Sequence, residues 1–268
     1  MEEQTKPSLE KALAKTEEDA TNCLKSAHSV ALSLRKLYNA AKLGNLKELR
    51  VAMDGIEKVE LVLRQQIVTT REGWAFAEED YLSSGSFIAE VLATAEQKGV
   101  RIFERDDRLY CYPVLIRVLP SERAVRIDKA TEKRLRPTVL VSRLKELQKR
   151  PPRFRPETFL EALYVAYEKA VKLKGKTLFH SGTVVPLLDL YELFTLLPGQ
   201  IKEYSRQEFA RDIYLLDRSG VATARKGAKV RFPASTGTKL ISRTLSVINE
   251  FGEEKRYYGI SFLQAGEE

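Results

Sequence analysis

A helical repeat over the first seventy residues constrains the fold of this chain more than any other feature. Apolar residues recur at steps of three and four over residues 8–43, as on one face of an α-helix. Gly44 and Asn45 end this repeat, and glycine accepts the left-handed conformation found at many helix ends. A second apolar face runs from Leu46 to Arg71. The face expected on the first helix comprises Leu9, Leu13, Ala20, Leu24, Ala27, Ala31, Leu34, Leu37, Tyr38 and Ala41. We predict an antiparallel helical hairpin that buries one stripe and must pack on the rest of the chain or on a partner.

The remainder of the chain mixes helices with short strands. Helical periodicity predicts helices at Phe87–Lys98, Val139–Gln148 and Glu157–Lys174. Alternation predicts a small antiparallel sheet over residues 100–128, in which Pro113 indicates an edge strand or a break. The prolines of residues 151–156 predict an extended connector. We therefore expect a mainly helical α+β fold with three parts: a helical hairpin (1–72), an α+β module with a basic segment (73–155) and a C-terminal module (156–268).

Positive charge is concentrated in two segments. The chain has 45 Lys and Arg against 37 Asp and Glu, a formal net charge of +8. Residues 123–155 carry twelve basic and three acidic residues, and residues 218–243 carry seven basic residues and no acid. The rest of the chain is therefore acidic, with a net charge of −8. Two basic segments on an acidic body favour binding to a polyanion, of which nucleic acid is the commonest, over simple solubilising charge.

The C-terminal part has a definite order of elements. An apolar helix is predicted over Thr183–Leu197. The next helix begins at a capping box, Ser205-Arg206-Gln207-Glu208. A hairpin over Val221–Phe232 follows, with Arg225-Lys226-Gly227 at its tip, and strands follow at Leu240–Ile248 and Arg256–Phe262.

This order, over residues 183–232, resembles a winged-helix module. The resemblance implies that the helix Ser205–Arg218 lies in the major groove while the hairpin contacts the backbone. The acids Glu203, Glu208, Asp212 and Asp217 share this segment and would repel phosphate unless they lie on the other side. Phe87–Ile127 has a similar helix-then-hairpin order, so a tandem arrangement is an alternative to an unrelated α+β sheet.

Basic side chains of both segments and of the capped helix are the candidate nucleic-acid contacts. Arginine binds phosphate bidentately and stacks on bases, so Arg153-Phe154-Arg155 could hold a backbone and one base. The alternative is that Phe154 anchors the connector in the core while the arginines face water. Lys239 ends a loop of small residues and hydroxyls that could hold a phosphate, although it lacks the P-loop glycines. The candidates are Arg134, Arg136, Arg143, Arg150, Arg153, Arg155, Arg206, Arg211, Arg225, Lys226, Lys229, Arg231 and Lys239.

Catalytic and metal-binding patterns have little support. The chain has two histidines and two cysteines, too few for a histidine-rich or cysteine-based metal site. His180-Ser181 are adjacent, and adjacent residues usually point apart; the acids at residues 78–80 and 106–107 are typical of solvated surface. We expect no enzyme activity, no cofactor and no metal. The longest apolar runs are too short to span a bilayer and the N-terminus lacks a secretory signal, so we expect a cytoplasmic protein.

These observations lead to two hypotheses. The first is a non-enzymatic protein that binds nucleic acid, duplex DNA in particular, through phosphate contacts. The second is an adaptor subunit of a multi-protein complex that handles DNA, with an ATPase or nuclease as its partner. In that case the helical hairpin and the winged-helix surfaces would dock on protein, or the hairpin would join two copies of the chain. Salt-sensitive DNA binding by a monomer would favour the first hypothesis.

Overall fold

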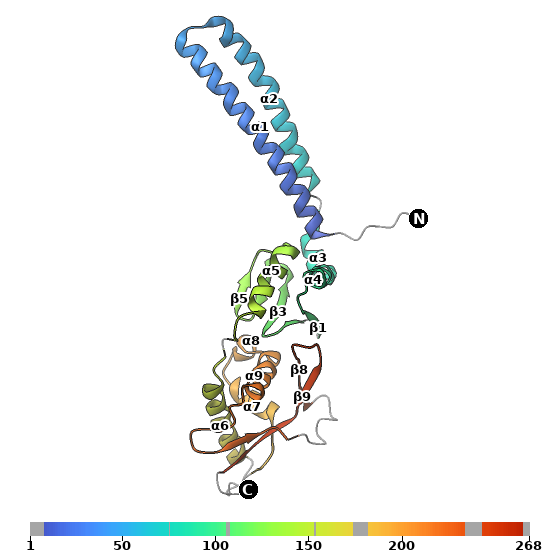
Figure 1. Ribbon diagram of the computed structural model, residues 1–268, viewed down its shortest axis with the longest axis vertical. Helices are drawn as coiled ribbons and strands as arrows, with labels where there is room; N and C mark the ends of the chain where they lie inside the picture. Colours follow the sequence, from blue (N-terminus) through green and yellow to red (C-terminus); the bar gives the residue numbers. More distant parts are fainter. Residues whose placement is uncertain are drawn as a thin grey trace, which may run out of the picture. The chain divides into compact units, whose positions relative to one another are not determined.

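The computed structural model shows a mainly helical α+β fold with antiparallel sheets (Figure 1). The structure describes residues 8–74, 76–105, 108–152, 154–173, 182–233 and 243–264. Two compact units divide the chain. The first comprises Met1–Lys98, Val118–Val125 and Thr131–Arg143, and the second comprises Gly99–Arg117, Arg126–Ala130 and Leu144–Glu268. None of the described helices is both long and apolar enough to cross a membrane.

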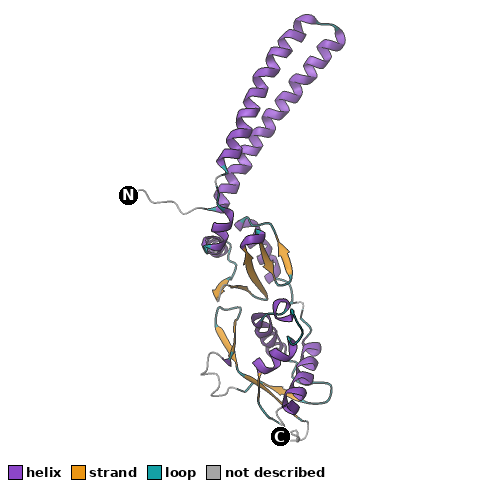
Figure 2. Cartoon of the chain, turned by 180° about the vertical axis from the view of Figure 1, so that it is seen from behind, coloured by secondary structure: helices purple, strands orange, loops and turns teal. Residues whose placement is uncertain are grey.

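The first unit contains the predicted helical hairpin, formed by α1 (Leu9–Leu43) and α2 (Leu46–Gly73). The two helices lie side by side (Figures 1 and 2). Gly44 ends α1 with a φ of 69°, and its N–H donates to the carbonyls of Ala40 and Ala41. Asn45 then caps α2, because its side chain accepts from the Glu48 N–H. The tight turn predicted at Gly44-Asn45 is therefore confirmed.

The face by which α1 contacts α2 differs from the predicted one. The partly buried positions of α1 follow a second heptad, and several are small or polar, including Thr16, Cys23, Ser26 and Ser33. Cys23 Sγ lies 3.7 Å from Thr70 Oγ1 across the seam. Most of the apolar face expected on α1 is exposed instead. The expectation was wrong because a helix seam also accepts small and polar side chains, so the most apolar face of α1 is not the one that contacts α2.

The first turn of α1 is attached to the short helices that follow the hairpin, α3 (Glu78–Ser83) and α4 (Ser86–Gln97). Glu90 accepts hydrogen bonds from the Leu9 N–H at 2.9 Å, from the Ser8 hydroxyl and from the Tyr81 hydroxyl. One carboxylate thus satisfies N-terminal donors that the helix itself leaves without partners. The sequence patterns did not indicate α3.

A five-stranded sheet follows, with strands in the sequence order β1-β2-β3-β4-β5. Its strands are β1 (Phe103–Arg105), β2 (Arg108–Cys111), β3 (Val114–Leu119), β4 (Ala124–Ile127) and β5 (Ala130–Glu132), with a 3₁₀ turn at Pro120–Glu122. Pro113 separates β2 from β3, so of the two alternatives given for this proline the break is the one observed; the two strands pair antiparallel with Leu109 opposite Ile116. Helix α5 (Pro137–Gln148) follows the sheet.

The C-terminal part of the second unit contains four helices and two small sheets among its described residues. Its elements are α6 (Pro156–Leu173), β6 (Val185–Pro186), α7 (Leu187–Phe194), α8 (Gln200–Glu203), α9 (Arg206–Ser219), β7 (Lys229–Arg231), β8 (Leu245–Ile248), β9 (Glu254–Tyr257) and β10 (Gly259–Leu263). One sheet has the order β6-β10-β7 and the other pairs β8 with β9, all antiparallel. Phe209, Ile213 and Leu163 are fully buried in one core with Tyr167 and Phe262.

Two expectations for this part require correction. The apolar helix expected over Thr183–Leu197 begins only at Leu187, because Val185 and Pro186 pair with β10. The strand expected over Arg256–Phe262 is two strands, because β9 pairs with β8 before Tyr258, and β10 pairs with β6 and β7 after it. The capping box at Ser205 and Glu208 is confirmed. The hairpin expected at Val221–Phe232 is also present, with Thr223 bridged to Lys229.

Candidate nucleic-acid interface

A row of arginines crosses the first four strands of the five-stranded sheet. Arg105 of β1 lies directly opposite Arg108 of β2. The β2–β3 register, continued by one residue, places Arg108 opposite Arg117. The Asp128 N–H donates to the Leu115 carbonyl at 2.8 Å, and the same register places Arg126 opposite Arg117. Residues that lie opposite one another share a face of the sheet, on strands about 4.8 Å apart. We call Arg105, Arg108, Arg117 and Arg126 the arginine row.

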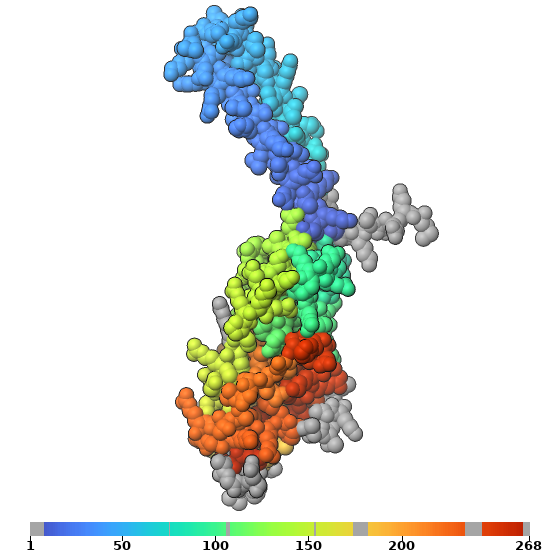
Figure 3. All heavy atoms as spheres, viewed as in Figure 1, coloured from blue at the N-terminus to red at the C-terminus, as the bar shows by residue number. Residues whose placement is uncertain are grey.

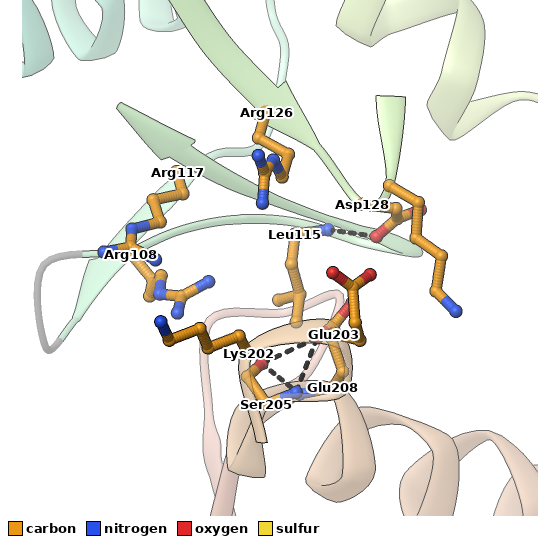
Figure 4. Close-up of a pocket in the computed structure, with 10 residues that line it drawn as sticks. Arg108, Leu115, Arg117, Arg126, Asp128, Lys202, Glu203, Ser205 and Glu208 are labelled. Carbon is orange, nitrogen blue, oxygen red and sulfur yellow. Dashed lines mark hydrogen bonds between the residues drawn. The ribbon is translucent and has the colours of Figure 1, made fainter. Parts of the chain in front are cut away.

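The last three members of the row line a cavity of about 170 Å³ within the second unit. In Figure 4, Arg108, Arg117 and Arg126 extend from the sheet, and Lys202 of α8 extends toward Arg108. The remaining lining residues are Leu115, Asp128, Lys129, Glu203, Ser205 and Glu208. Five cations and three carboxylates therefore line the cavity, an excess of two positive charges.

The carboxylates of this cavity are largely engaged elsewhere. Glu208 accepts from the backbone N–H of Ser205 at 2.7 Å in the capping box. Asp128 is ion-paired with Arg211 and accepts from the Leu115 N–H. Among the described residues, no acidic side chain forms an ion pair with Arg108, Arg117, Arg126 or Lys202.

Mutual repulsion is evident at Arg108. Partial burial lowers the pKa of this guanidinium, and the neighbouring charges of Arg117 and Arg126 lower it further, against the opposing effect of Glu208. Like charges directly opposite one another in a sheet cost stability. An anion bound between them would remove this cost, so the row is chemically suited to phosphate.

The predicted cations of residues 134–143 are paired with carboxylates. Arg134 lies 2.7 Å from Glu132, which also accepts from Arg143 at 3.1 Å. Arg136 donates to Glu10 at 2.6 Å and to Glu17 at 2.5 Å, both on α1. The charge counted along this segment is therefore partly neutralised, by Glu132 within the segment and by Glu10 and Glu17 far away in the chain. The structure does not join these residues into a free basic stripe.

Two roles were considered for the connector that follows: binding of a nucleic-acid backbone and one base, or anchoring by Phe154 in the core. Phe154 is partly buried against the core of the second unit, with its ring 5.4 Å from that of Phe159. This contact favours the anchoring alternative over base stacking. Arg150 and Arg155 are exposed, and Arg153 lies outside the described residues.

The capped helix α9 offers few free cations. Arg211 is mostly buried and forms ion pairs with Asp128 and, at 3.0 Å, with Asp212. Arg206 donates to the Thr244 carbonyl at 2.6 Å. Half of the helix is buried in the core, including Phe209 and Ile213. These contacts give Arg211 a structural role and leave little of α9 to enter a groove.

The hairpin tip is more accessible. Arg225, Lys226, Lys229 and Arg231 are all exposed. Lys226 also lies 3.5 Å from Glu168 and over the Tyr164 ring. The Gly227 N–H donates to the Ala224 carbonyl at 2.8 Å and closes the turn. The tip thus presents a short, rigid group of cations. Lys239 lies outside the described residues.

The groups considered for catalysis remain dispersed or outside the described residues. His28 is exposed on α1, and Glu78 is engaged by Arg123 and by Trp74 Nε1. His180, Ser181 and the acids 106–107 lie outside the described residues. Burial raises the pKa of the Cys111 thiol to about 12, which is unsuited to a nucleophile. Within the described ranges, no group of three or more His, Cys, Asp or Glu side chains could hold a metal ion.

Sequence reasoning did not select Arg105, Arg108, Arg117 or Lys202, and it counted Arg126 only as part of a basic segment. The register of the antiparallel strands, and not their spacing in the sequence, brings these arginines into one row. Comparison with known proteins adds no assignment: no family model, no curated protein and no solved structure matches this chain.

Proposed function

We propose that this protein binds the phosphate backbone of nucleic acid, duplex DNA in particular, without catalysing a reaction. The observation that carries the proposal is the arginine row, in which Arg108, Arg117 and Arg126 converge with Lys202 on one cavity. Arginine is the residue best suited to bidentate phosphate contact. Binding would release counterions from the DNA, so the affinity should fall steeply with salt.

The C-terminal elements support a winged-helix-like module as part of this proposal. Helices α6, α7 and α9 precede the strands β7 and β10, and β6 completes their antiparallel sheet. This module is larger than the sequence resemblance covered, because it includes α6 and β10. The ion pairs of Arg211 argue against α9 as a groove helix, so we place the backbone contacts on the arginine row and on the hairpin tip.

The experiment is a fluorescence anisotropy titration of labelled duplex DNA with the full chain, repeated over a range of salt concentrations. The test variant replaces Arg108, Arg117 and Arg126 by Gln. Its matched control replaces the exposed cations Lys47, Arg50 and Lys58 of α2 by Gln, which changes the net charge equally.

We expect the test variant to lose about tenfold or more in affinity and to show a salt slope shallower by up to about three. The control should retain most of the affinity. Equal losses of affinity in both variants would mean that binding depends on the net charge of the chain and not on the arginine row. A wild-type chain that does not bind DNA at low salt would overturn the proposal.

The adaptor function is the second candidate. Its support is the helical hairpin, where Leu24, Leu43 and Leu46 are each more than two-thirds exposed. A docking role does not exclude DNA binding, because the hairpin and the arginine row are separate surfaces.

A further inference from the structure

The outer face of α1 carries an apolar heptad stripe that no described residue covers. Leu24 is 71% exposed, Leu34 49% and Tyr38 65%, and the alanines between them are exposed as well. These residues repeat at alternating steps of four and three, the spacing of a coiled-coil seam. We call the residues Ala20, Leu24, Ala27, Ala31, Leu34 and Tyr38 the outer stripe. Helix α1 is the darker blue part of the hairpin in Figure 3.

The outer stripe is distinct from the seam that holds the hairpin together. The seam positions of α1 include Cys23, Ser26 and Val30, which are partly buried against α2. One helix thus carries two heptad stripes side by side, and the more apolar of the two is the one without a partner in the structure. Removing such side chains from water stabilises an association by about 25 cal/mol per Å² of apolar surface.

The charges of α1 select the partner and its direction. Up to Asp19 the helix carries four acids and two lysines; Glu10 and Glu17 are paired with Arg136, so Glu18 and Asp19 are the acids offered to a second copy. From Ala20 to Leu43 the helix carries four basic residues and no acid. Two copies of α1 in antiparallel orientation place each acidic half beside a basic half. In parallel orientation the basic halves would lie side by side and repel, since packed helices are only 8–10 Å apart.

The side-chain sizes point to the same arrangement. Antiparallel pairing centred on Ala27 places Glu18 opposite Lys36 and Asp19 opposite Arg35. In that register Leu34 lies opposite Ala20 of the second copy, and Leu24 lies opposite its residue 30, beside Ala31. Both leucines of the stripe thus lie next to an alanine of the second copy, as knobs-into-holes packing requires.

We propose that two copies of this chain associate through the outer stripe of α1, antiparallel and centred on Ala27. The stripes of the two copies overlap from Ala20 to Leu34, about 21 Å at 1.5 Å per residue. The association would place two arginine rows in one particle, so it extends the proposed function without depending on it.

Sedimentation velocity of the full chain over a range of concentrations is the first test, and we expect a dimer. Leu24→Glu should weaken the dimer about tenfold or more. The control Leu61→Glu removes a leucine of α2 that is similarly exposed, at 64%, and should leave the dimer intact. Circular dichroism checks that both variants keep their helix content.

Cysteine cross-linking then tests the direction of pairing, in a Cys23→Ser background. Ala27→Cys should form a disulfide between copies under mild oxidation. Ala20→Cys should not, because antiparallel pairing separates the two positions by about 20 Å, well beyond disulfide reach.

Three results would overturn the proposal. A wild-type monomer at all concentrations would show that a second copy does not cover the stripe. Equal effects of Leu24→Glu and Leu61→Glu would place the interface elsewhere, and equal cross-linking at residues 20 and 27 would indicate parallel pairing.

Discussion

Arg105 and Arg108 lie directly opposite one another on β1 and β2, yet their surroundings differ. Arg105 forms an ion pair with Glu254 at 2.9 Å. Arg108 has no such partner among the described residues and faces the like charges of Arg117 and Arg126 instead. Sheets normally avoid like charges in opposite positions. This contrast within one cross-strand pair supports the proposal that an anion binds in the cavity beside Arg108.

Arg108→Gln should therefore stabilise the free protein while weakening DNA binding. Relief of the repulsion should raise the free energy of unfolding by about 0.2–1 kcal/mol, as measured by urea denaturation without DNA. Arg105→Gln is the matched control, because it removes an ion pair and should bring no gain. A clear loss of stability in Arg108→Gln would show that this arginine serves the fold and not a ligand.

The hairpin tip should contribute to affinity without sequence preference. Replacement of Arg225, Lys226 and Lys229 together by Ala removes charge from an exposed turn and should weaken binding of all duplexes alike, with a shallower salt slope. Anisotropy with two unrelated duplexes measures this effect. Unchanged affinity would remove the tip from the interface and leave the arginine row alone.

Arg211 should matter for stability. Its side chain is 16% exposed and is shared by Asp128 and Asp212. Arg211→Ala would leave two carboxylates without their cation and should cost about 3 kcal/mol in the free energy of unfolding. Thermal and urea denaturation measure the loss, and the exposed Arg231→Ala is the control, with a change within about 0.5 kcal/mol. A similar small change for Arg211→Ala would contradict the structural role.

Glu132 should make the free energy of unfolding depend on pH under acidic conditions. Hydrogen bonds from the Arg134 side chain and backbone lower the pKa of this carboxyl from 4.5 to about 2, against the effect of burial, with further help from the charge of Arg143. A lowered folded-state pKa stabilises the protein above the unfolded value, and this stabilisation is lost as the pH falls from about 4.5 to about 2.

Glu132→Gln supplies the comparison. The difference in unfolding free energy between wild type and this variant should be constant above pH 5, shrink below about 4.5 and disappear near pH 2. Urea denaturation at each pH measures it. A difference that stays constant down to pH 2 would mean that the Arg134 contact does not hold in solution.

Local patterns were sufficient for the elements that local interactions stabilise. The hairpin turn at Gly44 follows from the conformational freedom of glycine, and the start of α9 follows from the reciprocal cap of Ser205 and Glu208. The extent of α1 and α2 follows from helical periodicity. These features depend on residues within one or two turns of each other, which is the range that a sequence pattern records.

Tertiary structure alone decided which cations are free and which are paired. The sequence made Arg136 a candidate nucleic-acid contact. In the structure it is ion-paired with Glu10 and Glu17, which lie well over a hundred residues away in sequence. Arg108, Arg117 and Arg126 lie on different strands, and only the register between those strands makes them one site. The sequence determined the amount and spacing of positive charge. Because ion pairs and strand registers join residues distant in the chain, only the fold could decide where that charge remains available.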